Sequence, residues 1–451
     1  MAASSSSTDV PQTALEFTDV SFTVFQKNYR GKKIGSRQIL SGVSGVFYVG
    51  KLHCILGPSG SGKTSLINIL GGRMRPGSHS VSYTVTLGGR PVEPRATRAQ
   101  FGFVEAHDAL YPTDTPVEAF EFVAQLKLGR KFSPAEIDQK VVSMITSLGL
   151  EKCQTTPIMR GISSGEKRRT CIGLGLLPDP EILFLDEPTT GLDSYSALQI
   201  VSLLKQVAGR RVCVVAVLHQ PSAEILALFD TVLFMAKSSI AYHGPVDRVV
   251  SYFSNLGFQC PIHYNPADYV MFLLQTLGDA PIDEILNRYR TSDFSQIDDR
   301  RIYPETTPLL CIQSAQIHTQ FKYLLLREYR STVRDRSVVF LRIVLALTFG
   351  TLIGFLFFQV GDTSSINSSQ VGLVATLGVF SLVSSGQALV IAFANERPII
   401  IREYAAGLYS IGVYSVCKDL LEYPIVVIGV FIYLILGFFI GGLGGKFMLM
   451  V

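Results

Sequence analysis

The chain has 451 residues, 47% of them hydrophobic, and a mean hydropathy of +0.32, which is high for a purely soluble protein. Its 40 basic and 36 acidic residues leave a formal net charge of only +4, which excludes a strongly basic nucleic-acid-binding protein. Its seven cysteines show no C-x-x-C spacing, which favours reduced thiols over zinc sites or disulfides. We therefore expect roughly two or three domains, with part of the chain in a membrane.

The N-terminal region predicts a small antiparallel sheet. We expect the serine-rich residues 1–14 to be disordered. Residues 15–24 alternate apolar and polar side chains, as a half-buried strand does, and residues 80–87 form a second such run before two glycines. The basic, glycine-containing residues 27–37 are predicted to form a hairpin loop.

The stretch Gly-Pro-Ser-Gly-Ser-Gly-Lys-Thr-Ser at residues 57–65 fits the P-loop pattern G-x-x-x-x-G-K-[ST] in full. It lies between a predicted strand over residues 51–56 and a predicted helix over residues 65–70, which is the strand-to-helix context that the pattern requires. Backbone amides at such a turn bind phosphate oxygens, and the helix N-terminus adds partial positive charge. We therefore predict an ATP or GTP site, with Lys63 on the β- and γ-phosphates and the Thr64 hydroxyl on Mg²⁺. The predicted nucleotide-binding residues here are Gly57, Ser59, Gly60, Gly62, Lys63, Thr64 and Ser65.

A second glycine-containing motif stands at the predicted start of an apolar helix. Residues 162–166 read Ile-Ser-Ser-Gly-Glu. Here the chain resembles the ABC transporter ATPases, whose signature has the form L-S-G-G-Q, with a serine in place of the first glycine. The resemblance implies that Ser163 and Gly165 face a γ-phosphate and that Ser164 and Glu166 belong to the same ATP-binding stretch.

A short apolar strand over residues 181–187 ends in two carboxylates and resembles the Walker B strand of these ATPases. By this resemblance Asp186 holds Mg²⁺ together with Thr64, while Glu187 is the catalytic general base. The following residues resemble the D-loop, and Asp193 in it is expected to belong to the ATP site.

An unbroken apolar run over residues 212–218 predicts a buried strand that ends at His219. In order and spacing His219 matches the switch histidine, so we assign it a catalytic contact with the γ-phosphate. One departure from the family pattern concerns the Q-loop, where Ala106 stands at the glutamine position. Glu105 or His107 is a candidate substitute for the missing amide.

The C-terminal part is apolar and predicted to be helical. A linker over residues 284–312 leads to an amphipathic connecting helix over residues 313–336, whose apolar residues fall on one face. Three stretches long enough to cross a membrane follow, at about 337–360, 371–393 and 423–442. Basic residues crowd before the first stretch, so we expect the N-terminal domain to be cytoplasmic.

The stretch Asn-Pro-Ala-Asp-Tyr at residues 265–269 resembles the G subfamily of ABC transporters, which contains half-transporters and pleiotropic drug resistance proteins. The resemblance covers almost the whole chain from Leu15. It implies an α/β P-loop nucleotide-binding domain, the ABC ATPase, over residues 15–283. It also implies an all-α transmembrane domain from residue 337, of which about three helices are present. Because such transporters carry six spans, the chain is expected to be a piece of a longer protein.

The resemblance implies a subunit that uses ATP and Mg²⁺ to move lipids, sterols or amphipathic xenobiotics across a membrane. It would act as a homo- or heterodimer with another half-transporter, each ATP site combining one P-loop with the partner's signature stretch. The alternative is an ATP-binding, non-transporting protein that regulates a full-length partner. Ala106, Ser164 and the missing spans favour this alternative, whereas the presence of Lys63, Asp186, Glu187 and His219 favours an active enzyme. We expect an integral membrane protein surrounded by membrane lipids, in the plasma membrane rather than an internal membrane, without a nucleic-acid partner.

Overall fold

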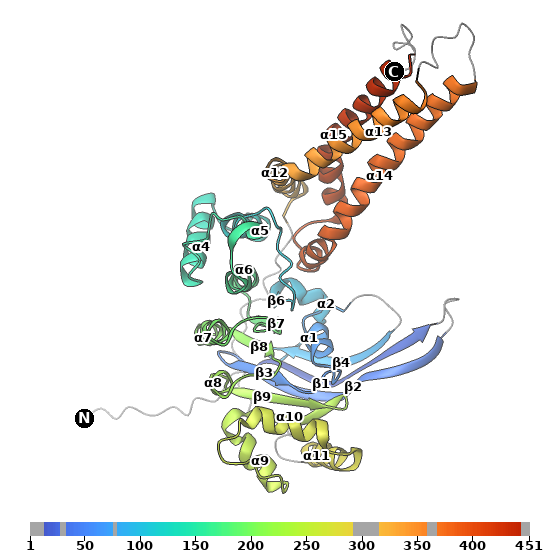
Figure 1. Cartoon of the computed structure of the whole chain (residues 1–451). Coiled ribbons are helices and arrows are strands. Elements are labelled where there is room, and N and C mark those ends of the chain that lie inside the picture. The colour runs from blue at the N-terminus through green and yellow to red at the C-terminus, as the bar shows by residue number, and fades with distance from the viewer. Residues whose placement is uncertain (1–12, 28–32, 75–78, 292–314, 359–367, 443–451) are drawn as a thin grey trace. The chain divides into compact units, whose positions relative to one another are not determined.

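The computed structural model describes residues 13–27, 33–74, 79–291, 315–358 and 368–442 (Figure 1). It divides into two compact units. Unit 1 comprises Met1–Ala109, Lys131–Thr155 and Ile162–Gln313, and unit 2 comprises Leu110–Arg130, Thr156–Gly161 and Ser314–Val451. A single domain boundary near residue 283 is therefore too simple, because two short segments of the predicted ATPase domain pack with the C-terminal helices. Most of the stretch predicted to be disordered, residues 1–12, lies outside the described residues.

The core of unit 1 is a six-stranded sheet with the strand order β10-β9-β3-β8-β7-β6. All neighbours run parallel except β9 and β10, which form an antiparallel pair. The apolar runs predicted as strands at residues 51–56, 181–187 and 212–218 are β3, β7 and β8, and every residue of these three strands is buried. The strands are β3 (Leu52–Leu56), β6 (Gly102–Val104), β7 (Ile182–Asp186), β8 (Cys213–Val217), β9 (Thr231–Ala236) and β10 (Ser239–Pro245).

Unit 1 also contains a four-stranded antiparallel sheet in the order β2-β1-β4-β5. The predicted strands at residues 15–24 and 80–87 are parts of β1 (Thr13–Lys27) and β4 (His79–Leu87), and the other strands are β2 (Lys33–Tyr48) and β5 (Arg90–Pro91). The hairpin loop predicted over residues 27–37 is shorter than expected, because Lys33 already pairs with Lys27. The Lys33 ammonium lies 3.9 Å from the centroid of the Phe25 ring, a cation–π contact that helps to hold this strand end.

Helices cover the sheets of unit 1 and include one where the sequence predicted a linker. The four apolar residues Ile282, Ile285, Leu286 and Tyr289 of α11 have helical spacing and are buried, and α11 packs against β10. The predicted linker at residues 284–312 therefore begins too early, and its remainder lies outside the described residues. The helices are α1 (Lys63–Leu70), α2 (Pro94–Thr97), α4 (Pro134–Ser147), α6 (Ser164–Leu176), α7 (Ser194–Gly209), α8 (Ala223–Ala227), α9 (Val249–Asn255), α10 (Pro266–Thr276) and α11 (Asp279–Thr291).

Unit 2 is helical. The predicted connecting helix is α12 (Ile317–Arg334), and it is followed at once by α13 (Arg336–Leu356). The second and third predicted spans are parts of longer helices, α14 (Ser368–Ala405) and α15 (Ile411–Ile440). Within the described residues, Val339–Leu356 and Ile411–Ile440 are long and apolar enough to cross a membrane. The two remaining helices, α3 (Pro116–Leu128) and α5 (Ile158–Gly161), come from the inserted segments.

Close packing between the apolar helices depends on glycine. A Cβ atom on Gly354 of α13 would lie 2.8 Å from the Cβ of Ile440, and one on Gly437 of α15 would lie 2.7 Å from the Leu377 side chain. Any larger residue at these two positions would push the helices apart, since real Cβ atoms do not approach so closely.

Ion pairs hold α12 to the other parts of unit 2. Arg327 and Glu403 form a buried pair at 2.8 Å, and the Arg327 guanidinium lies over the rings of Tyr111 and Phe122 at 4.5 and 4.1 Å. The Tyr409 hydroxyl donates a 2.6 Å hydrogen bond to the second oxygen of Glu403. Because a buried charge without a partner is costly, this arrangement fixes how α12, α14 and the segment 110–128 meet.

A second cluster centres on Lys418 of α15. Its ammonium lies 2.8 Å from a Glu328 oxygen and 2.6 Å from a Glu396 oxygen, so one cation joins two helices. The Tyr111 hydroxyl lies 2.9 Å from Glu328 and 3.2 Å from Glu396. Tyr111 therefore contacts both clusters, and the loop before α3 is bound to α12 at several points.

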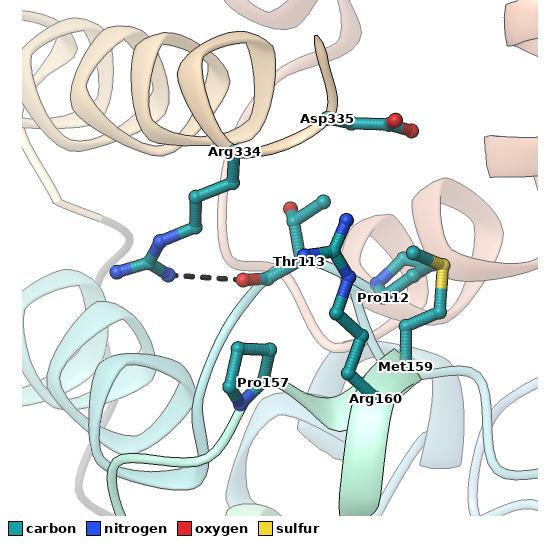
Figure 2. Close-up of a pocket in the computed structure, with 7 residues that line it drawn as sticks. All are labelled: Pro112, Thr113, Pro157, Met159, Arg160, Arg334 and Asp335. Carbon is teal, nitrogen blue, oxygen red and sulfur yellow. Dashed lines mark hydrogen bonds between the residues drawn. The ribbon is translucent and has the colours of Figure 1, made fainter. Parts of the chain in front are cut away.

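The end of α12 lies against the same loop, beside a small cavity of about 140 Å³. Figure 2 shows Arg334 donating a hydrogen bond of 2.9 Å to the carbonyl oxygen of Thr113. Arg334 also forms a two-pronged ion pair with Glu118 of α3, with N–O distances of 2.6 and 2.7 Å. Pro157 and Arg160, from the second inserted segment, line the other side of the cavity.

Asp114 gives unit 2 a pH dependence. Burial, the largest cause, raises the pKa of Asp114 to about 7, and the guanidinium of Arg327 offsets this only in part. The carboxylates of Glu118, Glu403 and Glu328 raise the pKa further. Because the folded pKa is above the ordinary value of 3.8, the stabilisation from protonated Asp114 is complete below pH 3.8 and is lost as pH rises through 7.

We predict that Asp114→Asn, compared with wild type, is more stabilising at pH 8 than at pH 5. The reason is that the amide stays neutral at both pH values, whereas the buried wild-type carboxyl ionises between them. The upper bound is about 3 kcal/mol, because the pKa of about 7 lies two pH units above pH 5 and each unit corresponds to about 1.4 kcal/mol. Thermal unfolding of the purified protein in detergent at the two pH values measures the effect, with the exposed Asp138→Asn as control. Equal pH dependence in wild type and Asp114→Asn would contradict the assignment.

Candidate functional site

The ends of three neighbouring strands bring the predicted site residues together. The P-loop follows β3, His219 follows β8 by two residues, and Asp186 and Glu187 end and follow β7. Because β8 lies between β3 and β7 and all three run parallel, the three carboxyl ends lie at one edge of the sheet (Figure 1). This edge is where open α/β sheets bind their ligands.

The P-loop is a tight turn that only glycine can form at two points. Gly62 has φ of 101°, and a Cβ atom there would lie 2.8 Å from the carbonyl oxygen of Ile39. A Cβ atom on Gly57 would lie 2.4 Å from the carbonyl oxygen of Met235. The Lys63 ammonium donates to the carbonyl oxygens of Gly57 and Pro58 at 2.7 and 3.0 Å, so the lysine lies along the inside of the loop. Burial lowers the pKa of Lys63, while Glu187 and Asp186 act in the opposite direction.

Thr64 and Asp186 form the part of the site suited to Mg²⁺. The Thr64 hydroxyl donates a 3.1 Å hydrogen bond to Asp186, which is buried at the end of β7. Burial raises the pKa of Asp186, and Glu187 adds to this effect. A hydroxyl and a carboxylate oxygen at this distance are the hard donors that Mg²⁺ takes from a protein when phosphates and waters supply the rest, so the residues fit the ion.

The backbone holds Glu187 in an unusual conformation. Its φ is 46°, in the left-handed region that side chains other than those of glycine rarely adopt. Its amide donates to the carbonyl oxygen of Val217 at 3.0 Å, which ties the residue to β8. The Thr190 hydroxyl donates a 3.0 Å hydrogen bond to the Glu187 carboxylate. The Glu187 backbone is thus fixed by β8 and its carboxylate is oriented by Thr190, as a general base that must face one water molecule requires.

His219 is exposed and lines a groove of about 690 Å³ together with Thr189 and Leu192 of the predicted D-loop. The motif at residues 265–269 has a local structural role beside this groove. Asn265 caps α10, accepting from the Ala267 amide, and its side-chain amide donates to the carbonyl oxygen of Pro221 at 2.9 Å. This bond fixes the loop that carries His219.

The predicted signature residues begin α6. The Ser163 hydroxyl accepts from the Glu166 amide at 3.2 Å, and the Glu166 carboxylate accepts from the Ser163 amide at 2.7 Å, which makes a complete capping box. These hydrogen bonds lower the pKa of Glu166 against the opposing effect of burial, the largest single cause. Ser164 is exposed, and Gly165 is buried near Ser196 of α7. Asp193 caps α7 by accepting from the Ser196 amide at 3.0 Å.

The structure thus divides the predicted site residues into two groups. Lys63, Thr64, Asp186 and Glu187 interact with one another at one edge of the sheet. The signature residues lie at the start of α6, which packs against β6 and α7, whereas α1 packs against β7. Within the described part of unit 1, the side-chain hydrogen bonds of Ser163 are to Glu166.

The structure does not support Glu105 or His107 as a substitute for the Q-loop glutamine. The Glu105 carboxylate pairs with Arg73 at 3.2 Å. His107 is exposed. One residue that the sequence did not single out joins this region to the end of β7. Arg168 of α6, 3% exposed, donates to the Asp108 carboxylate and to the backbone carbonyl oxygens of Asp186 and Glu187. Arg168 stands in a run of three basic residues, and such a run does not predict that one of its side chains is buried.

The fold and the site define the class: a P-loop ATPase with the motif order and strand order of the ABC type, joined to apolar helices. Comparison with known proteins supports this. A family model described as ABC transporter matches residues 40–190, and two described as ABC-2 type transporter match residues 319–451 and 219–290.

Curated relatives extend the match over most of the chain. ABC transporter G family member 4 of Arabidopsis thaliana is 32% identical, over 90% of this chain and 68% of that protein. Protein white of Drosophila melanogaster is 31% identical, over 86% of this chain and 59% of that protein. The broad substrate specificity ATP-binding cassette transporter ABCG2 of Bos taurus is 29% identical, over 92% of this chain and 68% of that protein. The chain spans about three-fifths to two-thirds of the length of these relatives. It belongs to the G family of ABC transporters.

We predict that Glu187→Gln lowers ATP hydrolysis by about 10²- to 10⁴-fold while leaving ATP binding within about twofold, because the amide keeps shape but loses basicity. Lys63→Ala should weaken ATP binding itself by about 10- to 100-fold through the loss of charged hydrogen bonds. Fluorescent-nucleotide titration and phosphate release measure the two steps, with the exposed Glu224→Gln as matched control. Near-normal turnover of Glu187→Gln would show that the base is another group.

Proposed function

We propose that the chain is the ATP-hydrolysing subunit of a transporter that moves lipids, sterols or amphipathic xenobiotics across a membrane. The observation that carries the proposal is the convergence of Lys63, Thr64, Asp186 and Glu187 at one sheet edge, in a chain with two helices apolar enough to cross a membrane. A phosphate-binding turn, a magnesium pair and an oriented carboxylate are the parts that phosphoryl transfer to water needs.

In the proposed reaction Glu187 accepts a proton from a water molecule whose oxygen bonds to the γ-phosphorus as the bond to ADP breaks. The Thr190 hydroxyl orients the carboxylate for this step. Lys63 moves from the loop carbonyls onto the phosphates, and His219 donates to the γ-phosphate. Thr64 and Asp186 would hold Mg²⁺, which when bound would neutralise charge on the phosphates.

We propose that two such chains form composite sites, as a homodimer or with another half-transporter. The support is the separation of the two groups of site residues, since α6, which begins at the signature, packs on β6 and α7, whereas α1 packs on β7. A signature serine supplied by a partner would complete the P-loop site. The helix N-terminus behind Ser163 then presents its amides to the γ-phosphate.

The proposed cargo class rests on the membrane helices and the family. Many large apolar side chains of α13 and α15 are exposed, among them Phe340, Phe355, Leu420 and Phe439, which suits contact with lipid or an amphipathic molecule. Among the relatives, ABCG2 is named for broad substrate specificity. The proposed location is the plasma membrane, with unit 1 in the cytoplasm.

Complementation tests the composite site. We expect Lys63→Ala and Ser164→Glu, each inactive alone, to recover part of the ATPase activity when co-assembled, because one of the two sites then contains an intact P-loop and an intact signature. Ser164 is exposed at the first position of α6, where an acid favours the helix yet repels phosphate.

The matched control is the Lys63→Ala, Ser164→Glu double variant co-assembled with wild type, which has no intact pair. Activity in the control and none in the mixed single variants would place each site within one chain. Co-assembly is verified by capturing two different affinity tags.

Transport is tested separately, in proteoliposomes that contain fluorescent phospholipid, sterol or drug probes. We expect ATP-dependent probe movement that Glu187→Gln abolishes. ATP binding without hydrolysis or movement in wild type would overturn the proposal and favour a regulatory protein.

A further inference from the structure

Arg168 lies buried in unit 1 with every donor occupied. A guanidinium has five N–H groups, and a buried one is stable only when they are paired. The acceptors of Arg168, at 2.6 to 3.0 Å, are four backbone carbonyls and one carboxylate: Glu105 O, Asp186 O, Glu187 O, Pro188 O and Asp108 Oδ1. The Arg168 side chain is 3% exposed.

Three of these acceptors are consecutive carbonyls at the carboxyl end of β7. They belong to Asp186, Glu187 and Pro188, where the chain leaves the sheet with Glu187 in the left-handed conformation. Such a conformation is strained and persists only when the surroundings determine it. The shortest of the five bonds, 2.6 Å, is the one to the Glu187 carbonyl. Arg168 therefore holds the backbone from which the catalytic carboxylate projects.

The other two acceptors belong to the Q-loop region. The same terminal nitrogen donates to the Glu105 carbonyl at 2.7 Å and to the Asp108 carboxylate at 3.0 Å. These residues flank Ala106, which has no polar side-chain atom. Two residues after Asp108 the chain enters unit 2, where Tyr111 contacts Glu328 of α12.

We infer that Arg168 is a positioning residue that links the Q-loop segment to Glu187. It acts through backbone carbonyls on both sides, so the link does not need a glutamine at position 106. A displacement of residues 105–108 is passed by one rigid guanidinium to the carbonyls of residues 186–188. The inference rests on the proposed ATPase function.

The test compares Arg168→Lys with Arg169→Lys, the same substitution at the next position of α6. Arg169 donates a 3.4 Å hydrogen bond to Gln199 and contacts none of the carbonyls above. Lysine keeps the charge of Arg168 but offers three donors from one point, which cannot serve both segments. We expect Arg168→Lys to lower kcat about 10- to 100-fold while KM for MgATP and nucleotide affinity stay within about threefold.

Epistasis separates positioning from general loss of structure. If Arg168 acts through Glu187, then Arg168→Lys in the Glu187→Gln background should lower the residual single-turnover rate less than about twofold. Multiplied losses, or equal kcat changes for Arg168→Lys and Arg169→Lys, would overturn the inference. An inactive wild type would instead contradict the proposed function.

A milder variant covers the case in which Arg168→Lys does not fold. Asp108→Asn keeps the side-chain shape and removes only the ion pair to Arg168. We expect kcat to fall about two- to tenfold with an unchanged melting temperature, and no further loss in the Glu187→Gln background. Unchanged kcat in Asp108→Asn would count against the Q-loop side of the link.

Discussion

The site depends on the parallel pairing of β3, β8 and β7. Val217, the last residue of β8, is the register partner of Ile55 on one side and of Asp186 on the other. Its carbonyl accepts from the Glu187 amide, and the next residue, Leu218, donates to Ile55. One strand end thus fixes both neighbours, and two interstrand spacings place β7 roughly 10 Å from β3. A one-residue slip of β7 would turn Asp186 away from Thr64, because alternate side chains face opposite sides of the sheet.

Much of unit 1 could be predicted because its signals are local. The P-loop glycines, the buried runs that became β3, β7 and β8, and the order of the motifs along the chain are visible in single stretches of sequence. The extent of β2, the helix α11 and the burial of Arg168 were not predicted, because each depends on a distant partner. Lys33 joins the sheet through Lys27, and α11 forms where it covers β10.

Unit 2 shows the same limit more strongly. The hydropathy of the sequence located the apolar helices, but it did not show which residues pair with the charged side chains within and beside them. Arg327 pairs with a residue 76 positions away, and Tyr111 with one 217 positions away. Arg327 and Glu403 are 4% and 3% exposed, and removing one partner of such a pair costs about 3–5 kcal/mol. The pairing therefore decides how α12 meets α14, although neither helix carries a local sequence signal for it.

The alanine at position 106 can be understood from these contacts. Glu105 is paired with Arg73, and His107 is exposed, so neither side chain takes the place of the glutamine that the family pattern carries there. What Arg168 holds in the segment is the backbone carbonyl of Glu105 and the carboxylate of Asp108. A link made of carbonyl groups is insensitive to the side chain between them. The loss of one amide at position 106 therefore leaves a physical connection between this segment and the end of β7.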